Sequence, residues 1–269
     1  MKNSCCICAT VKNCGQYIDD VFKNIKQIIK LFDEYYIIIY YDDSHDDTYE
    51  LLNKYKKIYK IKIHHNKTYN SSYRTHRLAY GRNYCLKKIN NYLSHYKYFI
   101  MMDFDDVCSS KIKLDVLKKN IINDKRWDAL SFNRKNYYDL WALSIRPYIF
   151  SYVHFKNPDI IINNMGIYIN KLLSSLDKND LLPCFSAFNG FSIYKTKIFK
   201  NCVYDGRIRL DLIPKEYLRE TIKENNSEIT FNKENWLSSR NEDCEHRSFH
   251  FDAINKKKAR ILISPEILF

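Results

Sequence analysis

Short apolar runs alternate with helix-like segments along the N-terminal part of the chain. The apolar, β-rich runs occupy residues 4–11, 35–41, 60–65 and 96–102. The segments between them space their apolar side chains at helical intervals and cover residues 21–32, 48–59 and 77–93. Strands that alternate with helices form parallel sheets that helices cover on both faces. The pattern therefore predicts an α/β, Rossmann-like fold with a mostly parallel, doubly wound sheet, whose ligand site lies at the carboxyl ends of the strands.

The second half of the chain is less regular. We expect strands at residues 127–134 and 188–199, and a helix followed by a last strand after residue 241. The stretch 149–180 looks like a partly helical insertion, and 215–235 like a loop or a loose helix. No repeat, low-complexity tract or Pro- and Gly-rich linker divides the chain, so we expect one domain over residues 1–269.

The net charge of +13 comes from 44 Lys and Arg against 31 Asp and Glu, and it raises the question of a nucleic-acid partner. The basic residues are spread along the chain, and only the three lysines at 256–258 form a tight run. The bias toward Lys, Asn, Ile and Tyr is typical of an AT-rich genome. We therefore interpret the charge as a solvated surface and expect no nucleic acid to bind.

Nine cysteines at irregular spacing fit reduced thiols better than a disulfide framework. Cys5 and Cys8 form a CxxC pair, but they lie in an apolar run that predicts buried thiols, and no second pair at zinc-ligand spacing accompanies them. No uncharged apolar run is long enough to span a membrane, and the N-terminus has no signal-peptide pattern. These features predict a soluble, cytoplasmic protein without a membrane span.

The most informative motif is Asp103-Phe104-Asp105-Asp106, directly after an apolar run. Alternation along an extended chain puts Asp103 and Asp105 on one face. Two carboxylates so close repel each other unless a cation lies beside them. Mn²⁺ and Mg²⁺ prefer oxygen ligands and also bind a diphosphate. The alternative is a helix N-cap with solvated acids, but at this place in the pattern we favour a metal site.

A second acidic cluster, at residues 42–48, follows the second apolar run. Asp42 or Asp43 can accept a hydrogen bond from a ribose hydroxyl or a base N–H at the strand end. Asp46 or Asp47 is better placed to cap the following helix. We expect a nucleotide contact from Asp42 or Asp43.

Four segments follow one another in the first half: ATVKN (9–13), YYDDSHDDT (40–48), RLAYGRN (77–83) and YFIMMDFDDV (98–107). In this order they resemble the nucleotide-sugar half of GT-A fold glycosyltransferases. The later segments WDALSFNR, YYDLWAL, AFNGFSIYKTKIF, EDCEH and ILISPE are similar in order to the cap-associated α-1,3-mannosyltransferase group and its distant relatives. The resemblance implies a GT-A fold with a nucleotide-binding half (1–108) and an acceptor half (109–269) that carries an insertion near 149–180.

The resemblance also implies a metal-dependent glycosyltransferase. Such an enzyme would move a sugar from a UDP-sugar, or alternatively a GDP-sugar, to a glycan or glycoprotein acceptor. Thr10 and Val11 would lie under the base, and Asp42 would lie near the uridine or guanosine. The sequence departs from the commoner pattern because Ser44-His45 stands where many relatives have Gly-Ser.

Three further residues are implied around the diphosphate. Arg82 would lie near the diphosphate or brace the metal loop. Asp103 would contact the ribose or the metal, and Asp105 would be the principal ligand of Mn²⁺ or Mg²⁺.

On the acceptor side, Asn189 and Gly190 match a glycine turn that lets the sugar approach the backbone. Asp243 matches the acid that faces the acceptor. It would be the general base if transfer inverts the anomeric centre, and would position the acceptor if transfer retains it. Sugars stack on aromatic rings and donate to carboxylates, so Asp139 and Trp141 could form an acceptor shelf; core packing is the alternative for Trp141.

The spacing near the C-terminus suggests a shared helix face. His246 is three residues beyond Asp243, and His250 is four beyond His246, so a helix that begins near Asn241 would align all three. GT-A enzymes often use a late histidine as a further metal ligand, and His246 is the candidate. The alternative is a polar helix face without a ligand.

Three other function classes would leave different patterns. A non-catalytic sugar-binding module would not need the acidic motif at 103–106 directly after a strand. A nucleotidyltransferase on a similar scaffold would need a glycine-rich, basic loop after the first strand, whereas residues 8–15 hold one Gly and one Lys. A basic nucleic-acid-binding protein would need clustered charge. Metal-dependent hydrolysis of a sugar nucleotide would separate the classes.

Overall fold

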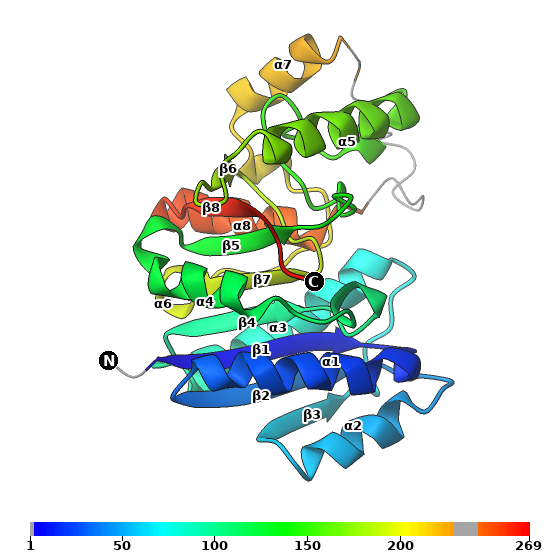
Figure 1. Ribbon diagram of the computed structural model, residues 1–269. Coiled ribbons are helices and arrows are strands. Elements are labelled where there is room, and N and C mark those ends of the chain that lie inside the picture. Colours follow the sequence, from blue (N-terminus) through cyan, green and yellow to red (C-terminus); the bar gives the residue numbers. More distant parts are fainter. Residues whose placement is uncertain (1–2, 227, 229–241) are drawn as a thin grey trace.

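The computed structural model describes residues 3–226, 228 and 242–269. Eight strands form one sheet (Figure 1), in the order β3-β2-β1-β4-β7-β5-β8-β6. In that order the strands span Ile61–His65, Glu34–Tyr41, Ser4–Val11, Tyr98–Met102, Phe191–Lys195, Ala129–Asn133, Ile261–Ile267 and Leu182–Cys184. The prediction of an α/β fold is confirmed.

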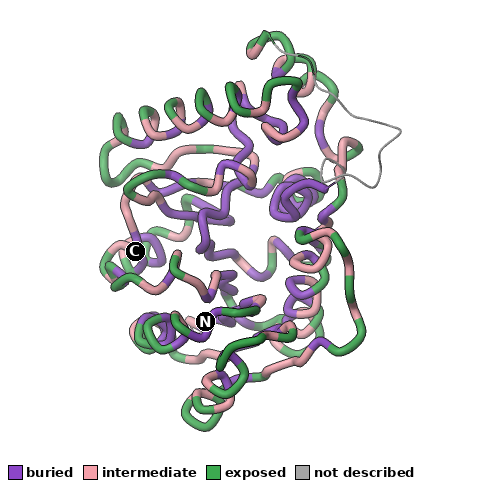
Figure 2. The backbone as a smooth tube through the Cα atoms, turned by 90° about the vertical axis from the view of Figure 1, so that its right-hand side faces the viewer, coloured by how far each residue is buried: buried purple, intermediate pink, exposed green. Residues whose placement is uncertain are grey.

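Helices cover both faces of this sheet. They are α1 (Gly15–Ile28), α2 (Thr48–Lys56), α3 (Arg74–Tyr92), α4 (Leu114–Ile122), α5 (Pro158–Ser174), α6 (Thr196–Phe199), α7 (Lys215–Glu224) and α8 (Glu245–Lys257). Apolar residues of α1, α2 and α4, such as Phe22, pack in one cluster with one face of the sheet. Those of α3 and α8, such as Leu86 and Phe249, pack in a second cluster with the other face. Figure 2 shows the buried residues concentrated between these layers.

The strand directions differ between the two halves of the sheet. β1 is parallel to β2 and to β4, and β2 is parallel to β3. β7 lies antiparallel between β4 and β5, and β6 lies antiparallel to β8, which is parallel to β5. Among the described strands, four of the seven pairings are parallel. The sequence could not show this mixture, because a strand buried on both faces is apolar whichever way it runs.

The second half contains helices and strands whose type or position the sequence pattern did not predict. The expected insertion at 149–180 is partly helical, and its α5 packs with Leu143 and Ile263 in a separate apolar cluster. The stretch predicted as a loop or loose helix contains α7, while its residues 229–235 lie outside the described residues. The sequence did not predict α4 or the three-residue strand β6. The assignment of one domain with two functional halves stays a prediction.

The parallel strands β1, β2 and β4 end at the same edge of the sheet, because they are adjacent and run in one direction. Lys12, Asp42 and Asp103 are the first residues after these three strands. The backbone N–H of Asp103 donates to the carbonyl of Gly190, 2.9 Å away, which ties this edge to the turn before β7. In the part of the chain that the structure describes, no helix is both long and apolar enough to cross a bilayer.

Candidate active site

A pocket of about 270 Å³ opens at this edge of the sheet. Six of the residues expected around a nucleotide sugar line this pocket: Thr10, Val11, Asp42, Arg82, Asp103 and Asp105. They come from β1, from the loops after β2 and β4, and from α3. The structure therefore brings together residues that lie far apart in the sequence, at the strand ends where the α/β pattern predicts a ligand site.

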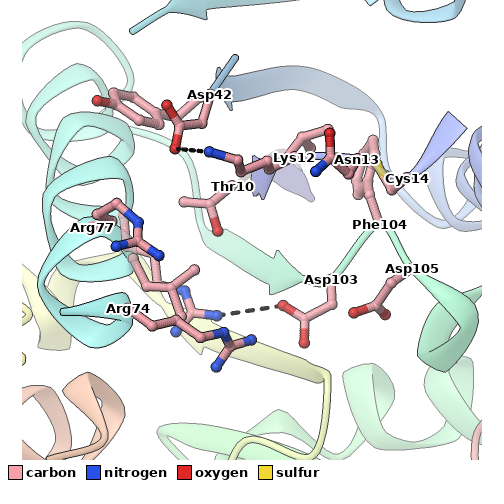
Figure 3. A pocket seen from close by; sticks show the side chains of 14 residues that line it. Thr10, Lys12, Asn13, Cys14, Asp42, Arg74, Arg77, Asp103, Phe104 and Asp105 are labelled. Atoms are coloured by element: carbon pink, nitrogen blue, oxygen red, sulfur yellow. Dashed lines mark hydrogen bonds and ion pairs between the residues drawn. The ribbon is translucent and has the colours of Figure 1, made fainter. Parts of the chain in front are cut away.

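Asp103 and Asp105 lie beside each other at the floor of the pocket (Figure 3). Burial and the charge of Asp105 raise the pKa of Asp103 to about 7, although Arg82 opposes this shift from 3.4 Å. Burial also raises the pKa of Asp105, whose carboxylate accepts a hydrogen bond from the Val107 N–H at 3.1 Å. Burial is thus the main cause of both shifts, and the negative charge of Asp105 adds to it at Asp103.

Such a pair fits a divalent cation with oxygen ligands, because the cation would offset the repulsion between the two carboxylates. Among the described residues, no group of three or more His, Cys, Asp or Glu side chains is arranged to hold a metal ion. The protein would therefore supply Asp103 and Asp105, and the remaining ligands would come from the substrate or from water.

Two arginines of the pocket were not predicted from the sequence. Arg74 and Arg77 line the pocket from the first turns of α3 (Figure 3). The charge of Arg74 lowers the pKa of Asp103, whereas the guanidinium of Arg77 donates to the carbonyl of Ser71. With Arg82 they lie at positions i, i+3 and i+8, which share one helix face. That spacing was a signal in the sequence, but the helix predicted there begins at residue 77, so Arg74 fell before it. Lys12 also lines the pocket and lies 3.3 Å from the carboxylate of Asp42.

The two candidate acids after β2 have different environments. Asp42 lines the pocket and accepts a hydrogen bond from the side-chain amide of Asn66 at 3.0 Å. Asp43 is exposed, and its hydrogen bond to His65 lowers the pKa of its carboxyl. Asp46 accepts from the backbone N–H groups of Gly15 and Thr48. Of Asp42 and Asp43, only Asp42 therefore faces the pocket.

Two acidic residues around the start of α8 hold helix α3 in place. Glu242 accepts hydrogen bonds from the backbone N–H and the hydroxyl of Thr75, at 2.9 and 2.7 Å. Glu245 forms an ion pair with Arg82, and both side chains are almost fully buried. The guanidinium of Arg82 also lies 4.8 Å above the ring of Phe188. These contacts fix the helix that carries the pocket's arginines.

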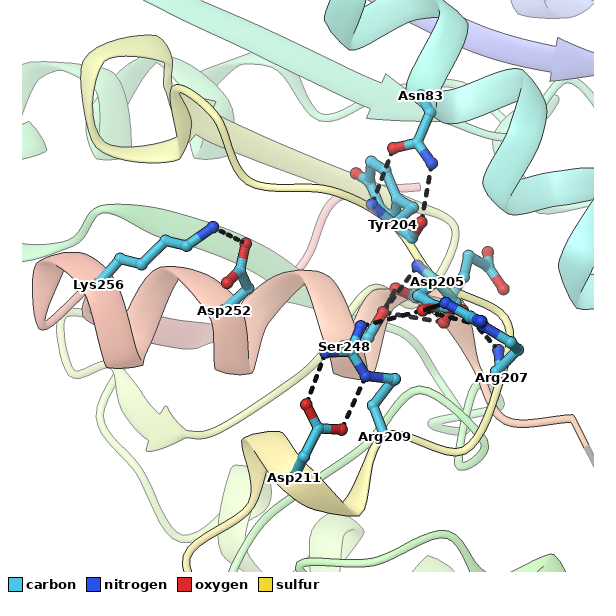
Figure 4. A network of polar contacts seen from close by, with 10 residues as sticks. Asn83, Tyr204, Asp205, Arg207, Arg209, Asp211, Ser248, Asp252 and Lys256 are labelled. Atoms are coloured by element: carbon cyan, nitrogen blue, oxygen red, sulfur yellow. Dashed lines mark hydrogen bonds and ion pairs between the residues drawn. The ribbon is translucent and has the colours of Figure 1, made fainter.

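The loop at residues 203–211 is hydrogen-bonded to both α3 and α8 (Figure 4). Asn83 of α3 exchanges two hydrogen bonds of 2.8 Å with the backbone of Tyr204. Ser248 of α8 donates to the Asp205 carbonyl and accepts from its N–H. Asp205 in turn pairs with Arg207 and Arg209. The loop is thus anchored to both helices that border the site.

A family model confirms what this geometry indicates. The model described as Glycosyl transferase family 2 matches residues 6–201, which run from β1 to just beyond α6. This match covers more than half of the chain. The chain belongs to glycosyl transferase family 2. Its α/β architecture agrees with the GT-A fold that the sequence predicted.

Solved structures of similar fold are distant in sequence. The crystal structure of S. aureus TarS 1-349 is 14% identical, with a TM-score of 0.48 over 98% of this chain and 59% of that one. The same protein in complex with UDP-GlcNAc is 16% identical, with a TM-score of 0.47 over 98% of this chain and 57% of that one. The mannosyltransferase PcManGT from Pyrobaculum calidifontis, in complex with GDP-Man and Mn²⁺, is 10% identical, with a TM-score of 0.43 over 76% of this chain and 48% of that one. The chain thus spans less than two thirds of these structures, and no curated protein matches it.

In this glycosyltransferase the expected helix face of Asp243, His246 and His250 does not form. Helix α8 begins at Glu245, so Asp243 precedes it, and Asn241 lies outside the described residues. Asp243 is buried and lies 2.9 Å from Nε of Arg247. It does not line the pocket that holds the two aspartates. The expectation failed because helical spacing was extended one turn before the helix begins.

His246 is buried in an aromatic environment. Its ring stacks on Phe188 at 3.8 Å, and neither ring nitrogen has a hydrogen-bond partner among the described residues. Burial and the nearby Arg82 lower its pKa well below the usual value. The structure does not group it with Asp103 and Asp105 as a third metal ligand. His250 is hydrogen-bonded to Ser186 at 2.9 Å, and so it belongs to the core.

The predicted acceptor residues gather beside the carboxylate pair. Asp139 accepts from the N–H of Asn189 at 3.2 Å, and Asn189 returns a contact to the Asp139 N–H. Burial raises the pKa of Asp139, whose charge in turn raises that of Asp103. Gly190 follows in the left-handed region with φ +82°. Trp141 packs against the apolar cluster under α3 and α8, as the packing alternative expected.

Proposed function

We propose that this family 2 glycosyltransferase transfers a sugar from a nucleoside diphosphate sugar to a hydroxyl group of a glycan or glycoprotein. The observation that carries the proposal is the pocket at the carboxyl ends of β1, β2 and β4. It places the paired carboxylates of Asp103 and Asp105 opposite the arginines of α3. A diphosphate needs cationic partners, and guanidinium groups bind phosphate oxygens in pairs.

The nucleoside would occupy the β1 and β2 side of the pocket. Thr10 and Val11 would contact the base, and the carboxylate of Asp42 would accept a hydrogen bond from a base N–H. Both uracil and guanine present such N–H groups. We favour a UDP-sugar and keep a GDP-sugar as the alternative donor.

The diphosphate would lie between Arg74, Arg77 and the two aspartates. Mn²⁺ or Mg²⁺ held by Asp103 and Asp105 would neutralise the charge that develops on the leaving diphosphate. Arg82 is fixed by Glu245, so its guanidinium would keep the carboxylate of Asp103 in a constant position.

The acceptor would approach from the side of Asp139, Asn189 and Gly190. The absence of a side chain at Gly190 would let the sugar reach the backbone there. Asp243 would take the proton of the acceptor hydroxyl if transfer inverts the anomeric centre, and would position the acceptor if transfer retains it.

The test is hydrolysis of UDP- and GDP-sugars by the purified protein, with and without Mn²⁺. We expect Mn²⁺-dependent release of the nucleoside diphosphate, and a loss on the order of 100-fold or more in Asp105→Ala. Asp106→Ala is the matched control, since this acid is the next residue but is exposed and does not line the pocket. Release that is absent with every donor, or equal in the two variants, would contradict the proposal.

A further inference from the structure

One continuous stretch carries almost all of the net charge. Residues 51–102 contain 12 Lys and Arg and no Asp or Glu, whereas the whole chain has a net charge of +13. At the average acidic content of the chain, about six acids would stand there. The stretch forms the end of α2, then β3, α3 and β4, at the side of the sheet where β3 is the edge strand (Figure 1). The basic residues are spread along the whole chain, but the excess of basic over acidic residues is therefore concentrated in this stretch.

The arginines and the lysines of this stretch have different places. Its three arginines all line the donor pocket. Two of its lysines have carboxylate partners: Lys54 pairs with Asp19, and Lys97 with Asp124. Four others lie around the edge strand and form no ion pair with any described carboxylate: Lys57, Lys60, Lys62 and Lys88.

A groove of about 440 Å³ lies beside two of these lysines, Lys62 and Lys88. Its apolar walls come from β2 and the end of α3, and Lys62 and Lys88 line it as well. Tyr92, in the last turn of α3, is 68% exposed, and the ammonium group of Lys88 lies 5.5 Å from the centre of its ring. The groove therefore combines an apolar floor with positive charge and an exposed aromatic ring.

A second exposed apolar side chain lies next to the edge strand. Ile58 is 62% exposed and stands between Lys57 and Lys60 in the turn that leads into β3. Ile58 and Tyr92 are thus exposed apolar side chains with lysines beside them in the chain or in space. We call this surface the lysine face and define it as Lys57, Ile58, Lys60, Lys62, Lys88 and Tyr92.

We propose that the lysine face docks the protein on a membrane surface that contains anionic lipids. Lysine ammonium groups are attracted to an anionic bilayer as point charges, at about 1 kcal/mol each. Tyrosine and isoleucine at such a surface can enter the boundary between headgroups and acyl chains. A nucleic acid would be held better by arginines, whose planar groups bind phosphates in pairs, and every arginine of this stretch lies in the donor pocket.

The proposal does not depend on the donor or on the reaction. It predicts a peripheral, salt-sensitive association, because charges at a surface are screened by salt. The protein would bind through the surface around the amino-terminal ends of β2 and β3. The pocket lies at the other ends of these parallel strands, where β1, β2 and β4 terminate. The pocket would thus stay open while the protein is bound.

The test is co-sedimentation of the full chain with vesicles of phosphatidylcholine alone or with about 30% phosphatidylserine. We expect binding only to the anionic vesicles, and a loss on the order of 100-fold in the triple variant Lys57→Gln/Lys60→Gln/Lys62→Gln. The matched control changes three lysines outside the lysine face, in the variant Lys256→Gln/Lys257→Gln/Lys258→Gln. These three lysines are consecutive at the end of α8, far from the edge strand β3. That variant should bind like the unchanged protein.

Insertion of the apolar side chain has its own readout. In Tyr92→Trp, fluorescence should shift to the blue on anionic vesicles and be quenched by lipids brominated in their acyl chains. Thermal unfolding of each variant shows whether it is folded, and these exposed changes should leave it unaltered. The proposal fails if anionic vesicles do not bind the protein or if both triple variants lose binding equally. It also fails if a labelled oligonucleotide binds more tightly than the vesicles.

Discussion

Glu245, at the start of α8, forms a buried ion pair with Arg82 in the middle of α3. The same guanidinium lies 3.4 Å from the carboxylate of Asp103. Glu245, near the C-terminal end of the chain, therefore helps to determine where the guanidinium of Arg82 lies beside the paired carboxylates. This contact links the family 2 domain to a tail that the family model does not cover, since the match ends at residue 201.

Glu245→Gln should destabilise the protein by roughly 3–5 kcal/mol, because it leaves the buried guanidinium of Arg82 without its partner. The double variant Arg82→Met/Glu245→Gln should lose less than the sum of the two single variants. Urea unfolding of the four proteins measures this coupling. Glu242→Gln is the control, because its amide oxygen can still accept from Thr75. Additive losses would show that the two side chains are not coupled.

The raised pKa of Asp103 predicts a pH dependence of stability. The folded protein holds this proton up to about pH 7, whereas an unfolded aspartate loses it near about pH 4. Asp103 therefore stabilises the fold at low pH, and this contribution declines as the pH rises from about 4 to 7. The buried His246 acts in the opposite direction, because its lowered pKa favours the fold at higher pH.

Comparison with Asp103→Asn isolates the aspartate from the histidine. As the pH rises toward 7, we expect the melting temperature of the variant to rise relative to that of the unchanged protein. Mn²⁺ should reduce this difference, since the carboxylate pair would then have a cation beside it. A difference that does not change with pH would contradict the raised pKa.

Gly190→Ala should destabilise the protein and impair the carboxylate pair together. Gly190 has φ +82°, a conformation that costs an L-residue about 1–2 kcal/mol. An added Cβ would also collide with a methyl group of Val107. Because the Gly190 carbonyl accepts the N–H of Asp103, the strain would reach the motif directly. Denaturant unfolding and Mn²⁺-dependent hydrolysis should both fall; Gly166→Ala, where a Cβ meets only ordinary packing distance, is the control.

The thiols give a test that needs no substrate. All nine cysteines are free, eight are buried, and Cys184 is partly exposed. Burial raises the pKa of Cys14 and Cys244 to about 12 and suppresses their reactive thiolate form. A thiol reagent should therefore react slowly with the native protein and titrate nine thiols after denaturation without a reductant. Fewer than nine would indicate a disulfide.

The sequence predicted the parts of the site that follow from local pattern. Asp103 and Asp105 could be found because they are neighbours directly after a buried strand, where carboxylates have no packing role. Asp42 follows from the same rule, since parallel strands end at one edge. Thr10 and Val11 were implied by the resemblance to GT-A fold glycosyltransferases. Helices and strands of the first half were predictable because each is a single apolar pattern bounded by polar residues.

What the sequence could not show depends on contacts between distant segments. Glu242 and Thr75 are separated by 167 positions, and no local pattern pairs them. The antiparallel insertion of β7 between β4 and β5 is equally invisible, because pairing partners are chosen by the whole sheet. Arg74 was overlooked for a different reason: the first turn of α3 has no apolar stripe that distinguishes it from the residues before it, so the predicted helix began at residue 77.

Asp243→Asn tests the acceptor side of the proposed reaction. If this carboxylate acts on the acceptor hydroxyl, the isosteric change should lower sugar transfer by roughly two to four orders of magnitude. Hydrolysis of the donor should survive better, because it needs the diphosphate and the aspartate pair but no acceptor. The measurement is the ratio of transfer to hydrolysis with one donor and a panel of glycan acceptors.

The buried ion pair between Asp243 and Arg247 offers a competing explanation, because its loss alone could disturb the site. Arg247→Met removes the same pair but keeps the carboxylate. Both variants should lose stability, by roughly 3–5 kcal/mol each, and both must be assayed well below their melting temperatures. If Asp243 acts on the acceptor, Arg247→Met should retain far more transfer relative to hydrolysis than Asp243→Asn. An equal fall in that ratio would assign Asp243 to the fold alone and leave the acceptor base to another residue, for which Asp139 beside Asp103 is the nearest candidate.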